Sequence, residues 1–291
     1  MNLNLKKSMD SRKGKNKLIY ILVCLFSFFA MIPLFLILWD VISKGYKNLN
    51  INLFTKVTPS SMDALIANMN GDPIPGGILN GITGSILIVG LAILFSVPLG
   101  LFIGIYLSEN RDKKFAGLVS YLTDLLQGMP SIVIGIIAYA WVVKPLGSYS
   151  ALAGSVALTM MMLPMIVRST EETLKMLPVS YKEAGLALGS SYTSVVFNIL
   201  LPSGFGGIFT GILLAISRVM GETAPLMLTA LGASVVNWNV MEPTSALPLL
   251  IWDFYNDPNL VELVWSTSLL LLIFIFLLNW IAKIVARKWK I

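Results

Sequence analysis

Six long apolar stretches, separated by polar and turn-rich segments, restrict what this chain of 291 residues can fold into. A helix needs about 20 predominantly apolar residues to cross the hydrocarbon core of a bilayer. Only 12% of the residues are charged, whereas soluble domains contain about 25%. We therefore expect an all-α membrane protein with six transmembrane helices, at residues 18–42, 79–107, 117–143, 151–168, 204–233 and 261–283.

The first apolar stretch follows a basic segment, residues 1–17, and so resembles a secretory signal. It is longer than a typical signal core, however, and no small-residue cleavage site follows it. We interpret it as a first helix that the protein retains. The polar segments are then an external loop at 43–78, a cytoplasmic segment at 169–203 and a C-terminal tail at 284–291.

Lysine and arginine are distributed unevenly among these segments. If the N-terminus is cytoplasmic, sixteen of them lie inside, Arg111 and Lys290 among them, and the four outside are Lys44, Lys47, Lys56 and Lys144. Cytoplasmic segments of membrane proteins carry such an excess of positive charge. We therefore expect both termini in the cytoplasm, and we interpret the net charge of +6 as a topology signal rather than as a nucleic-acid-binding surface.

The composition argues against an enzyme. Histidine is absent, and the single cysteine, Cys24, lies inside the first apolar stretch, so the usual metal ligands and nucleophiles are missing. The sequence also lacks the Gly-x4-Gly-Lys-Ser/Thr loop that cradles nucleotide phosphates. We expect no metal site, no cofactor and no ATP-binding site in this chain.

Two charged residues, Arg218 and Glu222, fall inside the predicted helix at 204–233. Their spacing of four residues places them on one face of a helix, where they can pair. Arg218 follows Gly204 by fourteen residues, about 21 Å along a helix axis, so it lies deep in the bilayer. Ionised groups at that depth are costly and usually mark a transport path. The alternative is an intrahelical salt bridge that only fixes helix packing.

A second pair, Arg168 and Glu171, lies three residues apart at the cytoplasmic end of the helix predicted at 151–168. Their spacing lets them pair on one face of a helix. Arg168 is equally explained as a positively charged anchor at the membrane interface, without any function in transport.

The segment Gly128-Met129-Pro130-Ser131 should break or kink the helix predicted at 117–143. Backbone groups freed by such a break are satisfied by protein or by water in a cavity, which makes Gly128, Pro130 and Ser131 candidate path-lining residues. Prolines are also common in membrane helices that line no path.

Small residues four apart indicate where helices approach each other closely. Such pairs occur at Gly100 and Gly104 and at Gly207 and Gly211. They predict packing and carry no information on substrate.

The cytoplasmic segment contains a motif with fixed spacing, Glu183-Ala184-Gly185-x3-Gly189-x9-Ile199-x-Leu201-Pro202. This pattern resembles the EAA signature of the permease subunits of ATP-binding-cassette (ABC) importers. The resemblance implies a coupling helix that docks on a separate ATPase, with Glu183, Ala184, Gly185 and Gly189 at the coupling site. Gly185 departs from the alanine usual in the family. The alternative is an ordinary amphipathic loop.

A further run matches a narrower family: Arg218-Val219-Met220-Gly221-Glu222-Thr223-Ala224-Pro225-Leu226. It resembles the R-x-x-G-E-T-A-P-L segment of the PstA family of phosphate permeases, and Gly128-Met129-Pro130-Ser131 and Gly76-Gly77-Ile78 also resemble segments of that family. The resemblance implies a type I ABC importer permease (MetI-like) fold, with residues 79–283 as the permease domain. It implies a path along Arg218, Glu222, Arg168 and Glu171, lined also by Thr223 and Pro225.

The same resemblance implies a set of partners. These are a second, PstC-like permease, two copies of a PstB-like ABC ATPase that binds ATP and Mg, and an external PstS-like phosphate-binding protein. It implies a multi-pass protein of the bacterial cytoplasmic membrane. Permeases for sulfate, molybdate or phosphonate remain an alternative. An ion-coupled secondary transporter is a further one, although Glu222 is the only deep carboxylate that we identify and no inverted repeat is evident.

Overall fold

The computed structural model describes residues 2–110 and 112–288, so Arg111 and Lys290, used above to orient the chain, lie outside the described residues. Apart from one bridge between Leu231 and Thr244, the regular structure of the described residues is helical. The elements are α1 (Asn2–Gly45), η1 (Tyr46–Asn48), α2 (Ile51–Thr55), α3 (Ser61–Asn70), α4 (Leu79–Glu109), α5 (Lys114–Gly128), α6 (Ser131–Ala138), η2 (Tyr139–Val143), α7 (Lys144–Leu146), α8 (Ala151–Met176), α9 (Val179–Ala187), α10 (Tyr192–Val195), η3 (Val196–Leu200), α11 (Leu201–Val219), α12 (Ala224–Met227), α13 (Leu247–Asn256) and α14 (Val261–Lys288).

Five described helical segments are long and apolar enough to cross a membrane: 19–48, 79–109, 151–176, 192–219 and 261–288. The bent pair 114–128 and 131–146 makes a sixth if it is one span. The chain is therefore a multi-pass, all-α membrane protein, as expected.

Two predicted helices differ from the observed ones. The helix expected at 117–143 is divided at Met129 and Pro130, and its two parts meet at 108°. The helix expected at 204–233 is wrong in its C-terminal part, because α11 ends at Val219. Pro225 has no N–H to bond the carbonyl of Gly221, four residues before it, and its ring clashes with that carbonyl in a helix. Gly221 also lowers helix propensity, so the apolar sequence continues while the helix does not.

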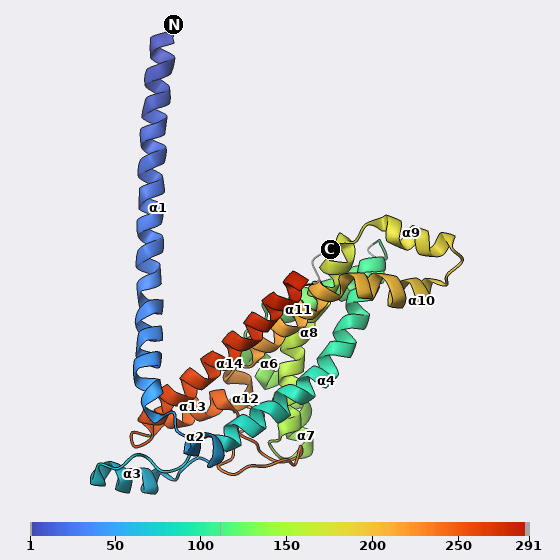
Figure 1. Cartoon of the computed structure of the whole chain (residues 1–291). Coiled ribbons are helices and arrows are strands. Elements are labelled where there is room, and N and C mark those ends of the chain that lie inside the picture. The colour runs from blue at the N-terminus through green and yellow to red at the C-terminus, as the bar shows by residue number, and fades with distance from the viewer. Residues whose placement is uncertain (1, 111, 289–291) are drawn as a thin grey trace.

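The centre of the fold is α8, which packs against α4 and α11, while α11 also packs against α14 (Figure 1). The main apolar core includes Ile88, Leu158, Met162 and Val219, all nearly inaccessible. Burial of such side chains stabilises a helical bundle when their neighbours fill the space around them.

Glycines allow these helices to approach closely. A Cβ atom at Gly100 would lie 2.6 Å from Ile166, and one at Gly104 would lie 2.6 Å from Thr170. On the other side of α8, a Cβ at Gly207 would lie 2.6 Å from Thr173. The close helix approach predicted from the small-residue spacing is confirmed.

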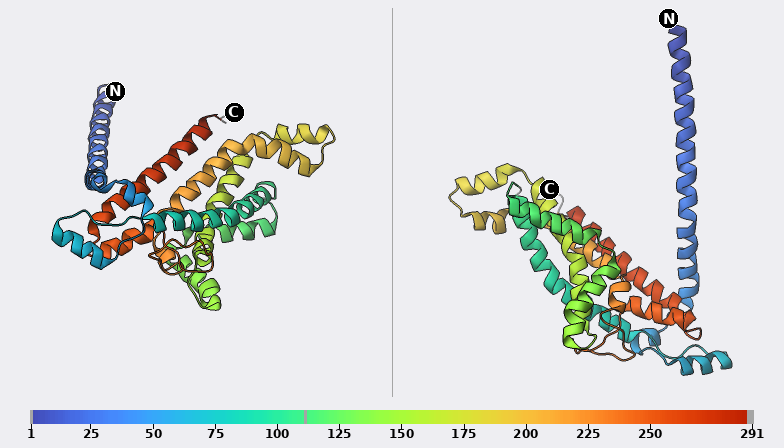
Figure 2. Two further views of the ribbon diagram at one scale, coloured as in Figure 1. Left: turned by 60° about the horizontal axis from the view of Figure 1, so that its bottom comes forward. Right: turned by 180° about the vertical axis from the view of Figure 1, so that it is seen from behind.

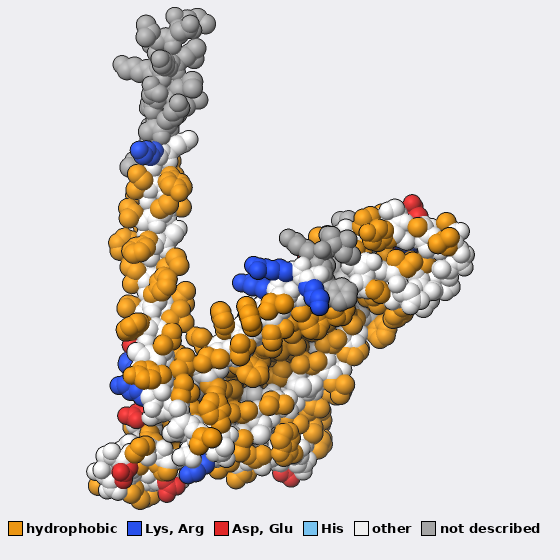
Figure 3. All heavy atoms as spheres, in the orientation of Figure 1, with side chains coloured by type: hydrophobic (Ala, Val, Ile, Leu, Met, Phe, Trp, Pro, Cys, Tyr) orange, Lys and Arg blue, Asp and Glu red, His pale blue; other side chains and the backbone are white. Residues whose placement is uncertain are grey.

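The long helix α1 stands apart from the bundle and meets it only near its C-terminal end (Figures 1 and 2). There, Gly45 lies against Trp265 and Leu269, and the Lys44 ammonium lies 4.4 Å from the centre of the Trp265 ring. Hydrophobic side chains cover α1 and the visible face of the bundle, as Figure 3 shows. These surfaces suit lipid or another membrane helix better than water.

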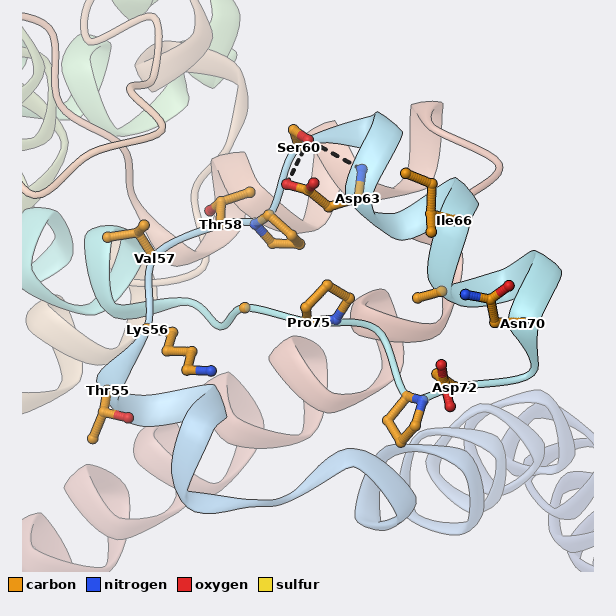
Figure 4. Close-up of a pocket in the computed structure, with 14 residues that line it drawn as sticks. Thr55, Lys56, Val57, Thr58, Ser60, Asp63, Ile66, Asn70, Asp72 and Pro75 are labelled. Atoms are coloured by element: carbon orange, nitrogen blue, oxygen red, sulfur yellow. Dashed lines mark hydrogen bonds between the residues drawn. The ribbon is translucent and has the colours of Figure 1, made fainter.

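The bundle has two distinct ends. The start of α1, the end of α14 and α9 lie at one end, which we call the α9 end, and α2, α3 and α7 lie at the other, the α3 end (Figures 1 and 2). At the α3 end, the Ser60 hydroxyl accepts a hydrogen bond from the Asp63 amide and so caps α3 (Figure 4).

The segment before α4 is held at the α3 end by one asparagine. The side-chain oxygen of Asn80 (Oδ1) accepts hydrogen bonds from the backbone amide and the hydroxyl of Thr58, at 3.2 and 2.9 Å. The side-chain nitrogen of Asn80 (Nδ2) donates to the backbone carbonyl of Ala233 at 2.7 Å. A cavity of about 840 Å³ lies beside this segment, between the start of α3 and Gly76 (Figure 4).

Candidate translocation and coupling sites

Arg168 of α8 is the centre of a charged cluster toward the α9 end. Its guanidinium donates to Glu171 at 2.6 Å, to Asp124 at 2.5 Å and to the Ser120 hydroxyl at 2.7 Å. Asp124 and Ser120 belong to α5, so the guanidinium joins α5 to α8. A planar guanidinium suits this role because its donors point in several fixed directions.

Glu171 accepts a second strong contact in the same cluster. The Lys175 ammonium lies 2.5 Å from its other carboxylate oxygen, and the Glu171 side chain is only 8% exposed. A carboxylate that is so buried is costly unless it is paired. Two cations and two carboxylates, Arg168, Lys175, Asp124 and Glu171, balance one another in the cluster.

The sequence prediction included Arg168 and Glu171 but missed their partners. Asp124 falls within the helix predicted at 117–143, and a charged residue in such an apolar stretch was a signal for a partner on another helix. Lys175 follows Glu171 by four residues, which also indicates pairing. The contact between α5 and α8 could not be derived from either spacing, because Asp124 and Arg168 are 44 residues apart.

Arg218 lies near the end of α11, on an exposed part of its surface. Its Nη1 atom lies 3.6 Å from the sulfur of Met165, and the described residues provide no carboxylate partner for it. Met165 precedes Arg168 by three residues on α8, so the two guanidinium groups reach neighbouring positions of one helix.

Glu222 is not on the same helical face as Arg218, because it lies beyond the end of α11. Its amide donates to the Val219 carbonyl in the turn that follows the helix. Among the described residues, no ion pair joins Glu222 to Arg218, so the prediction that the two share a helical face is wrong and the alternative of an intrahelical salt bridge is not observed. Glu222 is half-buried, and both charges of the predicted pair remain without an ionic partner within the described part of this chain.

The residues predicted to break helices lie at two breaks, one directly before α6 and the other directly before α12. Gly128 ends α5, Pro130 is extended, and Ser131 begins α6. In the second break, Thr223 precedes α12 and Pro225 is buried.

The two breaks are linked through α6. A Cβ atom at Gly135, four residues after Ser131, would lie 2.8 Å from the Cα of Pro225. The absence of a side chain at Gly135 therefore lets α6 contact α12.

The predicted coupling segment forms a helical hairpin at the α9 end. Glu183 and Ala184 are exposed on α9, whereas Gly185 faces inward, where a Cβ would lie 2.8 Å from Ile199 and 2.9 Å from Val195. The departure from alanine at position 185 thus coincides with close packing of α9 on the helix that follows the turn. Gly189 has φ of 79°, which glycine adopts without steric cost in the turn after α9.

The outer surface of the hairpin is apolar. Met176, Val179 and Leu188 are 77%, 68% and 87% exposed, and they surround Glu183 along the chain. Exposed apolar side chains of this kind outside a membrane-spanning helix indicate a protein contact surface.

Comparison with known proteins agrees with this architecture. Residues 96–291 match the family described as "Binding-protein-dependent transport system inner membrane component". The chain is 36% identical over 271 residues to the phosphate transport system permease protein PstA of Haemophilus influenzae, covering 92% of each chain. It is 33% identical over 270 residues to the probable PstA protein of Methanocaldococcus jannaschii, again covering 92% of each.

Solved structures show the same fold at low sequence identity. The inward-facing MetNI methionine ABC transporter superimposes with a TM-score of 0.62 at 20% identity, over 72% of this chain and 95% of that chain. An amino acid ABC transporter crystallised with histidines gives a TM-score of 0.51 at 13% identity, over 79% and 99% of the two chains. The fold is thus that of MetI-like ABC importer permeases, and the chain belongs to the binding-protein-dependent inner membrane component family and, within it, to the PstA permeases.

Proposed function

We propose that this chain is the transmembrane permease subunit of an ATP-driven importer of inorganic phosphate. The observation that carries the proposal is Arg218, a guanidinium on the exposed surface of a membrane-spanning helix, whose hydrogen-bond contact among the described residues is a methionine sulfur. An unpaired cation at that depth is costly unless it faces water, an anion or a second protein. A guanidinium also matches the oxygen geometry of phosphate. The name of the relatives supports phosphate as the anion.

The unpaired charges also support a second permease. Arg218 and Glu222 lie without ionic partners in the described chain, and a pseudo-symmetric, PstC-like subunit would enclose the path between the two proteins. In this arrangement phosphate passes between the subunits and meets Arg218 within the membrane.

The exit of the path is the cluster around Arg168. In the arrangement described above, Asp124 and Glu171 neutralise this arginine. A phosphate that leaves Arg218 toward the α9 end competes with Asp124, the more exposed of the two carboxylates, for the same guanidinium. This exchange lets the anion move without binding tightly at any one position, as conduction requires.

Energy comes from other subunits. Two PstB-like ATPases bind ATP and Mg, and their closure moves α9, whose exposed apolar residues and Glu183 form the docking surface. An external PstS-like protein delivers phosphate at the α3 end and supplies most of the specificity. Both termini and α9 then lie on the cytoplasmic side of a bacterial cytoplasmic membrane, in agreement with the distribution of lysine and arginine.

The test is uptake of labelled phosphate into vesicles that contain this chain with its candidate permease, ATPases and binding protein. We expect uptake that requires ATP and is not inhibited by sulfate or molybdate. Preferential uptake of sulfate or molybdate would show that this oxyanion, and not phosphate, is the substrate. It would leave the assignment as an ATP-driven importer unchanged. Uptake without the ATPases would contradict the ATP-driven mechanism.

A further inference from the structure

A second charged cluster lies at the α9 end, outside the predicted path. It consists of Glu109 at the end of α4, Lys182 on α9 and Tyr192 at the start of α10. These three residues come from helices that are separated in the sequence, and the functional prediction uses none of them.

The contacts within this cluster join α9 to α4. The Lys182 ammonium forms an ion pair with the Glu109 carboxylate and lies 5.2 Å from the centre of the Tyr192 ring. The same carboxylate interacts with the Tyr192 hydroxyl. The side chains of Lys182 and Glu109 are 33% and 15% exposed, so the pair is less screened by solvent than a surface salt bridge.

The covalent connections of α9 do not lead to α4. On one side, α9 follows α8 through the extended residues Leu177 and Pro178. On the other side, it leads through the turn at Gly189 into α10 and then α11. A displacement of α9 therefore reaches α8 and α11 along the chain, whereas α4 receives it only through side-chain contacts.

α4 packs closely on α8 through its glycines, but apart from the contacts of Glu109, its described contacts with the elements around α9 are apolar. Leu101 and Ile105 of α4 are partly buried against Leu174, Val195 and Ile208. Such contacts allow helices to slide, because they have no preferred direction. An ion pair fixes two atoms at a short distance and resists that motion.

We propose that the Lys182–Glu109 pair, supported by Tyr192, ties the docking helix α9 to α4, so that α4 moves together with α8 and α11 when the ATPases close. Lys182 and Glu109 are positioning residues, since neither lies on the predicted phosphate path. This inference rests on the proposed function and adds a second mechanical connection to it.

A matched control exists at the opposite end of the bundle. Lys44 also pairs with a carboxylate, Asp40 at 3.2 Å, and also lies over an aromatic ring, that of Trp265. Removing Lys44 deletes the same kinds of contact far from α9. A loss of coupling should therefore result from substitution of Lys182 and not from substitution of Lys44.

The experiment measures phosphate taken up per ATP hydrolysed in proteoliposomes that hold the complete assembly. The variants are Lys182→Met, Glu109→Gln, both together, and the exchange Lys182→Glu with Glu109→Lys, beside Lys44→Met. We expect each single substitution to lower the ratio by roughly fivefold, the double substitution to lower it no further, and the exchange to recover about half of the loss. Lys44→Met should leave the ratio unchanged.

Several results would contradict the proposed connection between α9 and α4 through Lys182 and Glu109. These are an unchanged ratio in the single variants, losses that multiply in the double variant, and a loss after Lys44→Met as large as that after Lys182→Met. If a single variant no longer co-purifies with the ATPase, the exchange decides: restored assembly and transport support the tie, and continued failure refutes it. If the unsubstituted assembly transports sulfate or molybdate in place of phosphate, the proposed substrate fails, and the ratio measured with that anion still tests the tie.

Discussion

Arg218 reaches across from α11 to α8, where its Nη1 atom lies 3.6 Å from the sulfur of Met165. The contact places this guanidinium one helical turn along α8 from Arg168. Two arginines 50 residues apart in the sequence thus approach the same helix, and the phosphate path that we propose runs past both of them.

Arg218→Ala should abolish most phosphate uptake while leaving the assembly and its ATPase subunits intact. A charge-assisted hydrogen bond contributes about 1.5–3 kcal/mol, so we expect uptake to fall by roughly 10- to 100-fold. Arg218→Lys should retain an intermediate rate, because lysine provides the charge without the planar fork. Lys144→Ala is the control for loss of a basic residue, and unchanged uptake in Arg218→Ala would remove Arg218 from the path.

Glu171→Ala should destabilise the protein more than Asp124→Ala does. Glu171 is 8% exposed and pairs with two cations, whereas Asp124 is 61% exposed. Loss of a buried partner costs about 3 kcal/mol, and loss of an exposed one costs about 1 kcal/mol or less. Thermal unfolding in detergent checks the order. Equal shifts in Tm would contradict the assignment of Glu171 as the buried centre of the cluster.

Gly211→Ala should push α8 and α11 apart. A Cβ at this position would lie 1.7 Å from the hydroxyl oxygen and 2.3 Å from the Cβ of Ser169, so the backbone has to move. Overpacking of this kind costs about 1–3 kcal/mol. The measurement is again thermal unfolding in detergent.

Two further variants control for the substitution at Gly211. Gly117→Ala on α5, where no atom lies within 4 Å, should raise stability by about 0.5–1 kcal/mol. Adding Ser169→Gly to Gly211→Ala should restore part of the loss. A Gly211→Ala protein as stable as the parent would show that the two helices separate without cost.

Gly185→Ala should preserve coupling, whereas Gly185→Val should reduce it. An alanine Cβ would approach the terminal Cδ1 atom of Ile199 to 2.8 Å and the Cγ2 atom of Val195 to 2.9 Å, and small side-chain rotations move these two methyl groups away. Alanine also favours the helix by about 1 kcal/mol over glycine. Valine adds two branches that press further atoms against the same two side chains. The measurement is phosphate uptake per ATP hydrolysed, and a loss in both variants would mean that α9 tolerates no side chain at position 185.

The length and hydropathy of the apolar stretches determined the class of fold. Whether a segment can cross the bilayer depends on its own residues, so four of the predicted spans correspond to continuous helical segments and the break at Pro130 was visible from proline chemistry. The fixed spacing around Glu183 and the Arg218 to Leu226 run likewise determined the family, since a motif is a local property of the chain.

The sequence alone did not determine the residue at which α11 ends. The stretch 204–233 is long enough to cross a membrane, and length alone extended the helix beyond Val219. The signals for its end were Gly221 and Pro225, but their effect depends on whether neighbouring helices compensate for lost hydrogen bonds. Here the contact of Gly135 with Pro225 stabilises the break, and it therefore separates Glu222 from the helical face of Arg218.

The charge pairs between different helices were decided by tertiary structure. The spacing of Arg168 and Glu171 is local, and their ion pair follows from it, but Asp124 reaches Arg168 only because α5 packs on α8. Lys182 and Glu109 are 73 residues apart in the sequence, and they form an ion pair because the fold brings α9 close to the end of α4. Sequence patterns fix which side chains share a helix face, whereas the distance between faces of different helices depends on the packing of the whole bundle.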